Sequence, residues 1–310
     1  MDGLRRPEAD LLDLLEKTSR TFALSIPPLP EPTRREVTVA YLLFRIADTL
    51  EDAAHLPPDA RIRALRDFIG LLRDPSPIEA ARLSGEWTGA GWATHPGYQE
   101  LLGEIPFVLD AFGALSPGAI EAIRGPVVRS ADGMASFVAR MRDGRLALSS
   151  LDDLRAYCYV VAGLVGEMLT ELFILERPPF AAVAPDLRKS ASSFGEALQL
   201  VNILKDAAGD AAEGRSYLPA SVPAEEVFAL ARRDLGSAGE YIEALERVQA
   251  PRGILEFTAL PVELAWATLD RIEQKGSGAK VSRPEVFFLV RRVREALDAG
   301  DSVAALCRRH

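Results

Sequence analysis

Residues 41–52 read YLLFRIADTLED, and the interpretation of the whole chain starts from this stretch. Steps of four, three and four residues separate Tyr41, Arg45, Asp48 and Asp52, so a helix places all four on one face. Apolar residues fill most of the positions between them. The stretch therefore predicts a largely buried helix with one polar stripe. Taken alone, an acidic pair on a helix more often marks a solvated surface than a functional site.

A second stretch, residues 199–210, reads QLVNILKDAAGD and repeats this arrangement. Gln199, Asn202, Asp206 and Asp210 share one helical face at spacings of three, four and four. Two such stripes predict a cavity with facing carboxylates, whose mutual repulsion a bound divalent cation would relieve. Mg²⁺ is the expected ion because hard cations prefer oxygen ligands. A network of buried helix caps and salt bridges is the alternative interpretation of the same spacing.

Helical periodicity also dominates the rest of the chain, and the alternating runs typical of strands are scarce. We expect an all-α fold with a single domain over residues 1–310, a helical bundle around a central cavity. Helices are predicted over roughly residues 8–24, 31–53, 58–73, 98–112, 117–142, 151–176, 186–211, 223–248, 252–274 and 283–298. Residues 85–97 are expected to form a surface loop, and residues 276–278 a flexible connector.

Composition excludes several classes of protein. The chain has 36 basic and 45 acidic side chains, a net charge of −9 that disfavours binding to nucleic-acid phosphates. Two cysteines and three histidines show neither zinc-ligand spacing nor a disulfide framework, so we expect a reducing cytoplasm. The N-terminus lacks a secretory apolar run. Residues 159–175 are the most apolar segment, but Glu167 and Glu171 interrupt it, which favours a buried helix over a membrane span.

Six segments, in order, resemble the squalene/phytoene synthase family and together span nearly the whole chain. They are residues 18–23 (TSRTFA), 48–52 (DTLED), 133–137 (GMASF), 157–166 (YCYVVAGLVG), 202–219 (the second acidic motif and its GRSYLP tail) and 280–283 (KVSR). Each segment is moderately specific, and their shared order makes the resemblance strong.

The resemblance implies a prenyltransferase whose two acidic motifs hold Mg²⁺ against substrate diphosphates. It assigns metal binding to Asp48, Glu51, Asp52, Asn202, Asp206 and Asp210. It assigns catalysis to the four aspartates together with Tyr41 and Arg45. The substrate contacts that it implies are Ser19, Arg20, Phe22, Val160, Val161, Gly163, Val165, Gln199, Asn202, Arg215 and Tyr217. Plain structural roles stay open: a salt bridge for Arg45, helix packing for Gly163, and packing behind Pro219 for Tyr217.

The resemblance also implies the reaction. Members join two prenyl diphosphates head to head through a cyclopropyl diphosphate; squalene formation then requires hydride from NADPH, which phytoene-type synthases omit. Farnesyl diphosphate is the favoured substrate here, and contact with the periphery of the inner membrane is an expectation. No membrane-spanning segment and no nucleic-acid partner are expected.

Three positions depart from the squalene synthase pattern. Gly209 replaces an acidic residue, Lys205 replaces an arginine, and Val160 stands where squalene synthases carry a tyrosine. Two alternatives follow: a phytoene or dehydrosqualene synthase that does not use NADPH, and a non-catalytic assembly or scaffold protein derived from the family.

Overall fold

The computed structural model describes residues 8–19, 21–141, 146–212 and 216–308, without the side chains of residues 8, 9 and 210–212. Within this described part there is no β-strand, and one isolated bridge pairs Ala147 with Ser216. The predicted all-α fold is therefore confirmed. The chain divides into two compact units, the first of residues 1–27 and 31–140 and the second of residues 28–30 and 141–310. The prediction of one domain over residues 1–310 stays a prediction.

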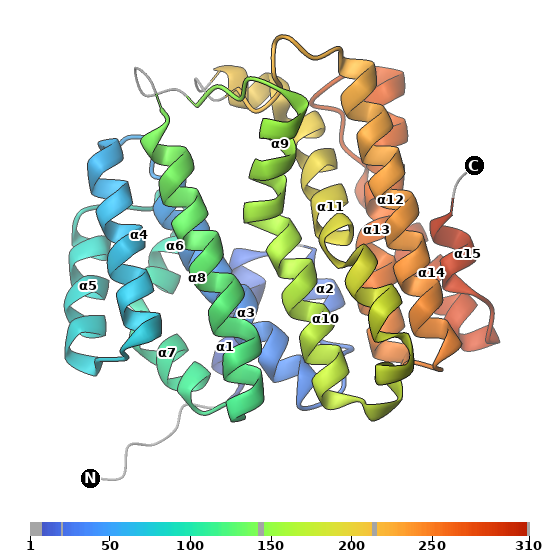
Figure 1. The fold of residues 1–310 in the computed structure, drawn as a ribbon, viewed down its shortest axis with the longest axis horizontal. Helices are drawn as coiled ribbons and strands as arrows, with labels where there is room; N and C mark the ends of the chain where they lie inside the picture. Colours follow the sequence, from blue (N-terminus) through green and yellow to red (C-terminus); the bar gives the residue numbers. More distant parts are fainter. Residues whose placement is uncertain (1–7, 20, 142–145, 213–215, 309–310) are drawn as a thin grey trace. The chain divides into compact units, whose positions relative to one another are not determined.

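The first unit contains eight of the described helices (Figure 1). They are α1 (Glu8–Thr18), α2 (Phe22–Ser25), α3 (Thr33–Glu51), α4 (Pro58–Arg73), α5 (Pro77–Gly89), α6 (Pro96–Gly103), α7 (Ile105–Gly113) and α8 (Pro117–Ala139).

The second unit contains the remaining described elements. They are α9 (Leu151–Cys158), the π-helical turn η1 (Tyr159–Gly163), α10 (Leu164–Glu176), the 3₁₀ turn η2 (Pro178–Val183), α11 (Ala184–Ala212), α12 (Ala224–Arg247), α13 (Arg252–Lys275), α14 (Arg283–Ala299) and α15 (Val303–Cys307).

Helix α3 forms the centre of the first unit and packs against α1, α4, α6, α7 and α8. From residue 36 to residue 51 every side chain is buried except Tyr41, Arg45 and Asp48. These three belong to the predicted polar stripe, whose fourth member, Asp52, is the exposed residue that follows the last residue of α3, so the structure confirms a buried helix with one polar face. The stripe escapes full burial because apolar residues occupy the other faces and take the packing contacts.

In the second unit, α9, η1 and α10 follow one another along α11 (Figure 1). A Cβ atom on Gly166 would lie 1.9 Å from the carbonyl oxygen of Ala191, and one on Gly195 would lie 2.0 Å from that of Ala162. The backbone of η1 and α10 therefore approaches that of α11 at a distance that only glycine allows. By length and composition, Leu151–Glu176 alone among the described helices could span a bilayer, but half of its most apolar window is buried inside the protein. The core helix of a globular protein meets the same criteria.

The structure corrects several predicted boundaries. The predicted helix over residues 8–24 is divided into α1 and α2, and that over residues 98–112 is divided into α6 and α7. The surface loop expected over residues 85–97 is wrong, because α5 extends to Gly89. Trp87 and Trp92 are 1% and 7% exposed, and their ring centroids lie 6.3 Å apart. Burial of these two large rings holds the segment against the first unit.

Candidate active site

Arg45 is held on the polar stripe of α3 by a short chain of hydrogen bonds. Its Nε donates to the hydroxyl of Tyr41 at 3.1 Å, and that hydroxyl donates to the carbonyl oxygen of Thr18 at 2.8 Å. A guanidinium nitrogen of Arg45 also lies 3.4 Å from a carboxylate oxygen of Asp48. The salt bridge that the sequence left open is therefore present, and it leaves other guanidinium N–H groups for a ligand.

A second tyrosine, Tyr98 on α6, completes the environment of Arg45. The guanidinium carbon of Arg45 lies 5.5 Å from the ring centroids of both Tyr41 and Tyr98, within the range of a cation–π contact. Helix α6 can approach α1 closely because residue 97 is a glycine. A Cβ atom at this position would lie 2.4 Å from the carbonyl oxygen of Lys17. Sequence reasoning missed Tyr98, since nothing in its local pattern indicates a contact with α3.

The carboxyl group of Asp48 is in an unusual electrostatic environment for a side chain that is 30% exposed. Burial among its neighbours raises the pKa of Asp48 to about 6, the Arg45 guanidinium opposes that rise, and the nearby Asp52 adds to it. Asp52 is exposed at the end of α3, whereas Glu51 is 6% exposed and belongs to the packed part of the helix. A cation near Asp48 and Asp52 would relieve both the desolvation and the repulsion.

The N-terminal motif lies beside this stripe. The hydroxyl of Ser19 accepts a hydrogen bond from the backbone N–H of Phe22 at 2.9 Å, which connects Ser19 to the first residue of α2. The rings of Phe22 and Tyr41 lie 5.4 Å apart. We call Arg45 with its partners Tyr41 and Tyr98 the Arg45 clamp. Two of the substrate contacts implied by the resemblance, Ser19 and Phe22, thus lie close to this clamp, while Arg20 lies outside the described residues.

The second acidic motif occupies the C-terminal part of α11 and faces solvent. Asn202 and Asp206 are exposed and Gln199 is half-buried. The ammonium group of Lys205 donates to Asn202 Oδ1 at 3.0 Å and lies 3.2 Å from Asp206 Oδ2. Lys205 therefore lies between the two candidate ligands and neutralises part of the charge of Asp206. Asp210 falls in the last turn of α11, where the structure describes the backbone alone, and Arg215 lies outside the described residues.

The connector between α13 and α14 braces this motif. The backbone N–H of Gly278 donates to the carbonyl oxygen of Lys205 at 2.7 Å, and the hydroxyl of Ser277 donates to the same oxygen at 3.1 Å. The backbone N–H of Ala208 donates to Ser277 Oγ at 3.2 Å. Residues 276–278 were expected to form a flexible connector, but these three bonds attach it to α11. No local pattern predicted this contact, because polar Gly-Ser-Gly segments usually form linkers.

The central signature segment forms the π turn η1. Val160, Val161 and Val165 are half-buried, so each presents some apolar surface. Gly163 is buried, and a Cβ atom there would lie 2.8 Å from the ring of Tyr159 and 3.2 Å from the Glu196 carboxylate. The structure thus gives Gly163 the packing role that the sequence left open. A substrate contact through Gly163 stays a prediction.

Tyr217, in the tail of the second motif, stacks on the buried Tyr157 of α9. Their ring centroids lie 4.9 Å apart, with the ring planes at 28°. One packing partner of Tyr217 is therefore a ring of the signature segment, while packing behind Pro219 stays a prediction. Stacking of this kind connects the segment that follows α11 to α9 within the second unit.

Behind η1, α11 and α12 carry two buried carboxyl groups that sequence reasoning missed. Glu196 and Asp234 are each 5% exposed. Burial, with the Asp234 charge adding to it and the Arg155 guanidinium opposing it, raises the pKa of Glu196 to about 7. Burial also raises the pKa of Asp234 to about 6. Arg155 Nε lies 4.0 Å from a carboxylate oxygen of Glu196, a distance too long to neutralise the buried charge fully.

The described side chains do not by themselves build a complete metal cage. Among them, no three His, Cys, Asp or Glu side chains come together to hold an ion. Mg²⁺ usually takes one or two protein carboxylates and completes its shell with water and substrate phosphate oxygens. The hard oxygen donors at Asp48 and Asp52, and at Asn202 and Asp206, therefore fit such an ion.

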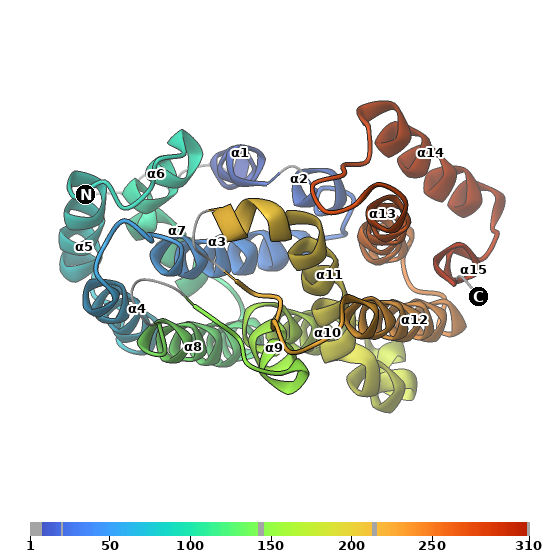
Figure 2. The same cartoon turned by 90° about the horizontal axis from the view of Figure 1, so that it is seen from above.

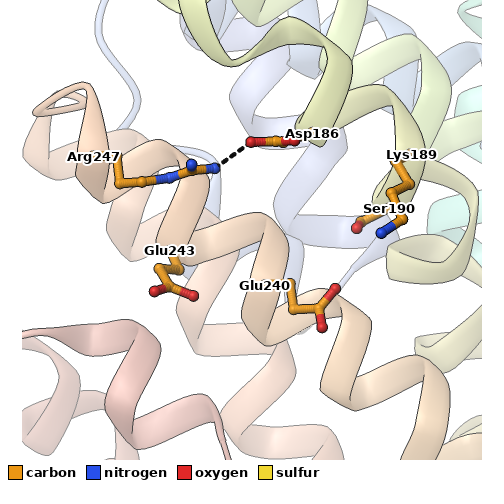
Figure 3. Close-up of a pocket in the computed structure, with 6 residues that line it drawn as sticks. All are labelled: Asp186, Lys189, Ser190, Glu240, Glu243 and Arg247. Atoms are coloured by element: carbon orange, nitrogen blue, oxygen red, sulfur yellow. Dashed lines mark hydrogen bonds and ion pairs between the residues drawn. The ribbon is translucent and has the colours of Figure 1, made fainter.

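A separate cavity of about 220 Å³ lies at the other end of α11, between α11 and α12 (Figure 3). Its lining residues are Asp186, Lys189, Ser190, Glu240, Glu243 and Arg247. Arg247 crosses it to form an ion pair with Asp186. At a rise of 1.5 Å per residue, Ser190 lies about 24 Å along the helix from Asp206, so this cavity is separate from the acidic motif.

Comparison with known proteins identifies the family. The squalene/phytoene synthase pattern matches residues 15–228, a range that includes both acidic motifs and the signature segment. The chain belongs to this family. The squalene synthase of Eremothecium gossypii is 30% identical over 277 residues, which cover 83% of this chain and 60% of that relative. The chain thus spans about 60% of the length of this curated relative.

Solved structures agree on the fold. The structure of TcSQS with the ligand E5700 has a TM-score of 0.74 at 23% identity and covers 96% of this chain and 94% of its own. A dehydrosqualene synthase solved with a ligand has a TM-score of 0.58 at 23% identity, covering 94% of this chain and 96% of its own. These likenesses support the all-helical architecture of the family.

Proposed function

We propose that this family member is a Mg²⁺-dependent prenyltransferase that joins two farnesyl diphosphates head to head to form squalene. In the first step two farnesyl diphosphates give a cyclopropyl diphosphate and one diphosphate, which carries away the proton lost from the coupled chain. In the second step the cyclopropyl diphosphate ionises, loses its diphosphate and takes hydride from NADPH, which becomes NADP⁺. The polar stripe of α3 is the observation that carries this proposal.

The stripe supports a diphosphate-handling role because it combines opposite charges on an otherwise buried helix. Arg45 has its guanidinium plane set by Tyr41 and Tyr98, and a fixed guanidinium suits bidentate contact with diphosphate oxygens. Asp48 is desolvated enough for its pKa to rise to about 6, so it gains from an approaching cation. The exposed Asp52 carboxylate, one helical turn beyond Asp48, adds a second negative charge beside this salt bridge.

Asp48, Asp52, Asp206 and Asp210 would hold the ions, with Glu51 and Asn202 as the further ligands that the resemblance implies. When bound, Mg²⁺ would neutralise the diphosphates and stabilise the charge that develops on the leaving group. Arg45 would orient that group, and Tyr41 would keep Arg45 in place. The half-buried Val160, Val161 and Val165 offer an apolar surface that would keep water from a prenyl cation.

A second candidate function is the NADPH-independent reaction of a phytoene or dehydrosqualene synthase. Val160 favours it, because squalene synthases carry a tyrosine at that position. The non-catalytic scaffold alternative draws on the loss of an acidic side chain at Gly209, but retention of the α3 stripe counts against it.

A product assay separates these candidates. The purified chain is incubated with farnesyl or geranylgeranyl diphosphate and Mg²⁺, with and without NADPH, and the extracted hydrocarbon is identified. We expect squalene from farnesyl diphosphate when NADPH is present, and no diphosphate release after the chelator EDTA is added.

Each other outcome has a defined meaning. A hydrocarbon unchanged by NADPH would exclude the squalene assignment and support the second candidate, and a preference for geranylgeranyl diphosphate would specify phytoene. No diphosphate release from any prenyl diphosphate would support the scaffold alternative. Turnover that survives EDTA would contradict the role of Mg²⁺.

We also propose a cytoplasmic location. The two cysteines, Cys158 and Cys307, are buried and form no disulfide, which is compatible with a reducing compartment. Fractionation of the source cells with an antibody against the chain tests this proposal, and recovery among exported proteins would contradict it.

A further inference from the structure

Helix α14 lies on the outer side of α13 in the second unit (Figure 2). It exposes two neighbouring aromatic side chains. Phe287 and Phe288 are 75% and 53% exposed, although large apolar residues are normally removed from water. Scattered exposed apolar residues are ordinary, but two adjacent exposed phenylalanines on one helix form an apolar patch of the kind found at interaction sites.

This exposure does not result from a loosely attached helix. Leu289 and Val293 on the opposite face of α14 are 6% and 1% exposed. Arg292 and Arg294 bind the buried carboxylates of Glu263 and Glu256 on α13, at 2.6 and 2.7 Å. These contacts fix the rotation of α14 about its axis, so the phenylalanines face outward as a consequence of how the helix is anchored.

Basic side chains lie on both sides of Phe287 along the chain. Arg283 and Arg291 lie four residues before and after Phe287, on the same helical face, and Lys280 lies just before the helix. Lys280 and Arg283 make no ion pair with any described residue, while Arg291 pairs with the exposed Glu295 at 3.3 Å. We define the Phe287 face as Lys280, Arg283, Phe287, Phe288 and Arg291.

We propose that the Phe287 face binds the surface of an anionic lipid bilayer. An interfacial helix usually carries aromatic side chains that enter the boundary between headgroups and acyl chains. Its arginine and lysine side chains then lie at the level of the lipid phosphates. The net charge of −9 opposes this approach, so the local cations are needed to offset it. This binding goes beyond the proposed function and does not depend on it.

Charge complementarity selects the lipid over a second copy of the chain. An isologous dimer through this face would bring Arg283 and Arg291 of both copies together, and like charges brought together in this way repel. An anionic lipid surface instead supplies a phosphate for each of these cations.

Co-sedimentation of the full chain with vesicles tests the proposal. Vesicles of phosphatidylcholine alone are compared with vesicles that contain about a third phosphatidylglycerol. We expect binding to the anionic vesicles, weakened by added salt, and at least about a tenfold lower partition coefficient for the double variant Phe287→Ser and Phe288→Ser. The matched control is Ile78→Ser on α5, which removes another exposed apolar side chain (84% exposed) and should bind like the wild type.

Two further variants locate the contact. Charge reversal by Arg283→Glu with Arg291→Glu should reduce binding to anionic vesicles. A Phe287→Trp variant should show fluorescence quenching by brominated acyl chains, because the native Trp87, Trp92 and Trp266 are 1%, 7% and 4% exposed and out of reach.

The proposal is overturned if the wild type binds no vesicles, or if the double serine variant binds as well as the wild type. It is also overturned if the wild type is dimeric on a sizing column while the double serine variant is monomeric, since the face would then join two copies of the chain.

Discussion

The two acidic motifs lie on helices of opposite character. On α3, the stripe is the only incompletely buried part of residues 36–51, and its arginine is fixed by two tyrosine rings and a hydrogen bond. On α11, Asn202 and Asp206 face solvent near the end of the helix, held by one lysine and by the connector that follows α13. One motif is preorganised by packing, and the other by a few exposed polar contacts.

The two motifs therefore differ in how strongly their carboxylates interact with a neighbouring charge. Desolvation gives Asp48 a raised pKa and makes its charge sensitive to a neighbouring cation. The exposed Asp206 keeps its hydration, so its interactions are screened by water and salt. We therefore expect the α3 stripe to contribute more to transition-state stabilisation than the α11 motif does.

The largest expected effect comes from neutralising one aspartate in each motif. Asp48→Asn should lower kcat/KM for diphosphate release by about 10³-fold and Asp206→Asn by about 10²-fold, because preorganised charges contribute most to catalysis. Circular dichroism should show an unchanged helical fold for both. The control is Asp74→Asn, an exposed aspartate at the far end of α4. Near-normal turnover of either variant would remove its motif from the mechanism, and equal losses would break the contrast between the helices.

The next effect concerns the buried half of α11. Because burial raises the pKa of Glu196 from 4.5 to about 7, the folded chain binds a proton that the unfolded chain has released between these values. Stability from this group is therefore greatest below pH 4.5 and falls as the pH rises towards 7. Glu196→Gln should remove about 1–3 kcal/mol of this pH dependence.

Urea unfolding of wild type and Glu196→Gln over a pH series measures that change. Glu225→Gln, at an exposed position on α12, serves as the control. Its free energy of unfolding should change with pH as that of the wild type does. Parallel curves for the wild type and Glu196→Gln would show that the buried carboxyl pair does not titrate in this range.

A smaller effect is expected at the second ring of the Arg45 clamp. Tyr98→Leu removes a cation–π contact of about 0.5–2 kcal/mol and should raise KM for the prenyl diphosphate by about 2–30-fold. Tyr98→Phe keeps the ring and should behave like the wild type in the same steady-state assay. If the leucine and phenylalanine variants were equally impaired, the hydroxyl rather than the ring would be the part that matters.

The smallest expected effect is at the brace of the α11 motif. Ser277→Ala removes the hydroxyl that donates to Lys205 and accepts from Ala208, at a cost of about 0.5–1.5 kcal/mol. Hydrogen exchange at the end of α11 should become faster, with at most a few-fold loss of activity. Ser221→Ala, which removes a hydrogen bond to Ser149 instead, is the control. Unchanged exchange would mean that the backbone bond from Gly278 suffices.

Much of the fold could be predicted because its signals are local. Residues 41–52 indicated one polar stripe, and the burial pattern of α3 confirms it. The 58–73 prediction matches α4 to the residue, since Pro58 and the apolar spacing define that helix. The prediction failed at residues 85–97, where glycines suggested a loop and the burial of Trp87 and Trp92 extended the helix and fixed the segment.

Of the candidate site, the sequence supplied Tyr41, Arg45 and Asp48 as one face, and the structure adds the hydrogen bond and the salt bridge that connect them. It could not supply Tyr98, which reaches Arg45 only because α6 packs against α1 through Gly97. Whether Asp52 and Asp210 face a shared cavity stays a prediction.

The sequence by itself determined the helical class, the two polar stripes and the family, because helix periodicity and motif order are properties of neighbouring residues. Only the tertiary structure decided that Tyr98 stacks on Arg45, that Ser277 braces α11 and that Glu196 is buried beside Asp234. These contacts join residues from separate helices and connectors, and their energies come from packing and desolvation, which no local pattern records.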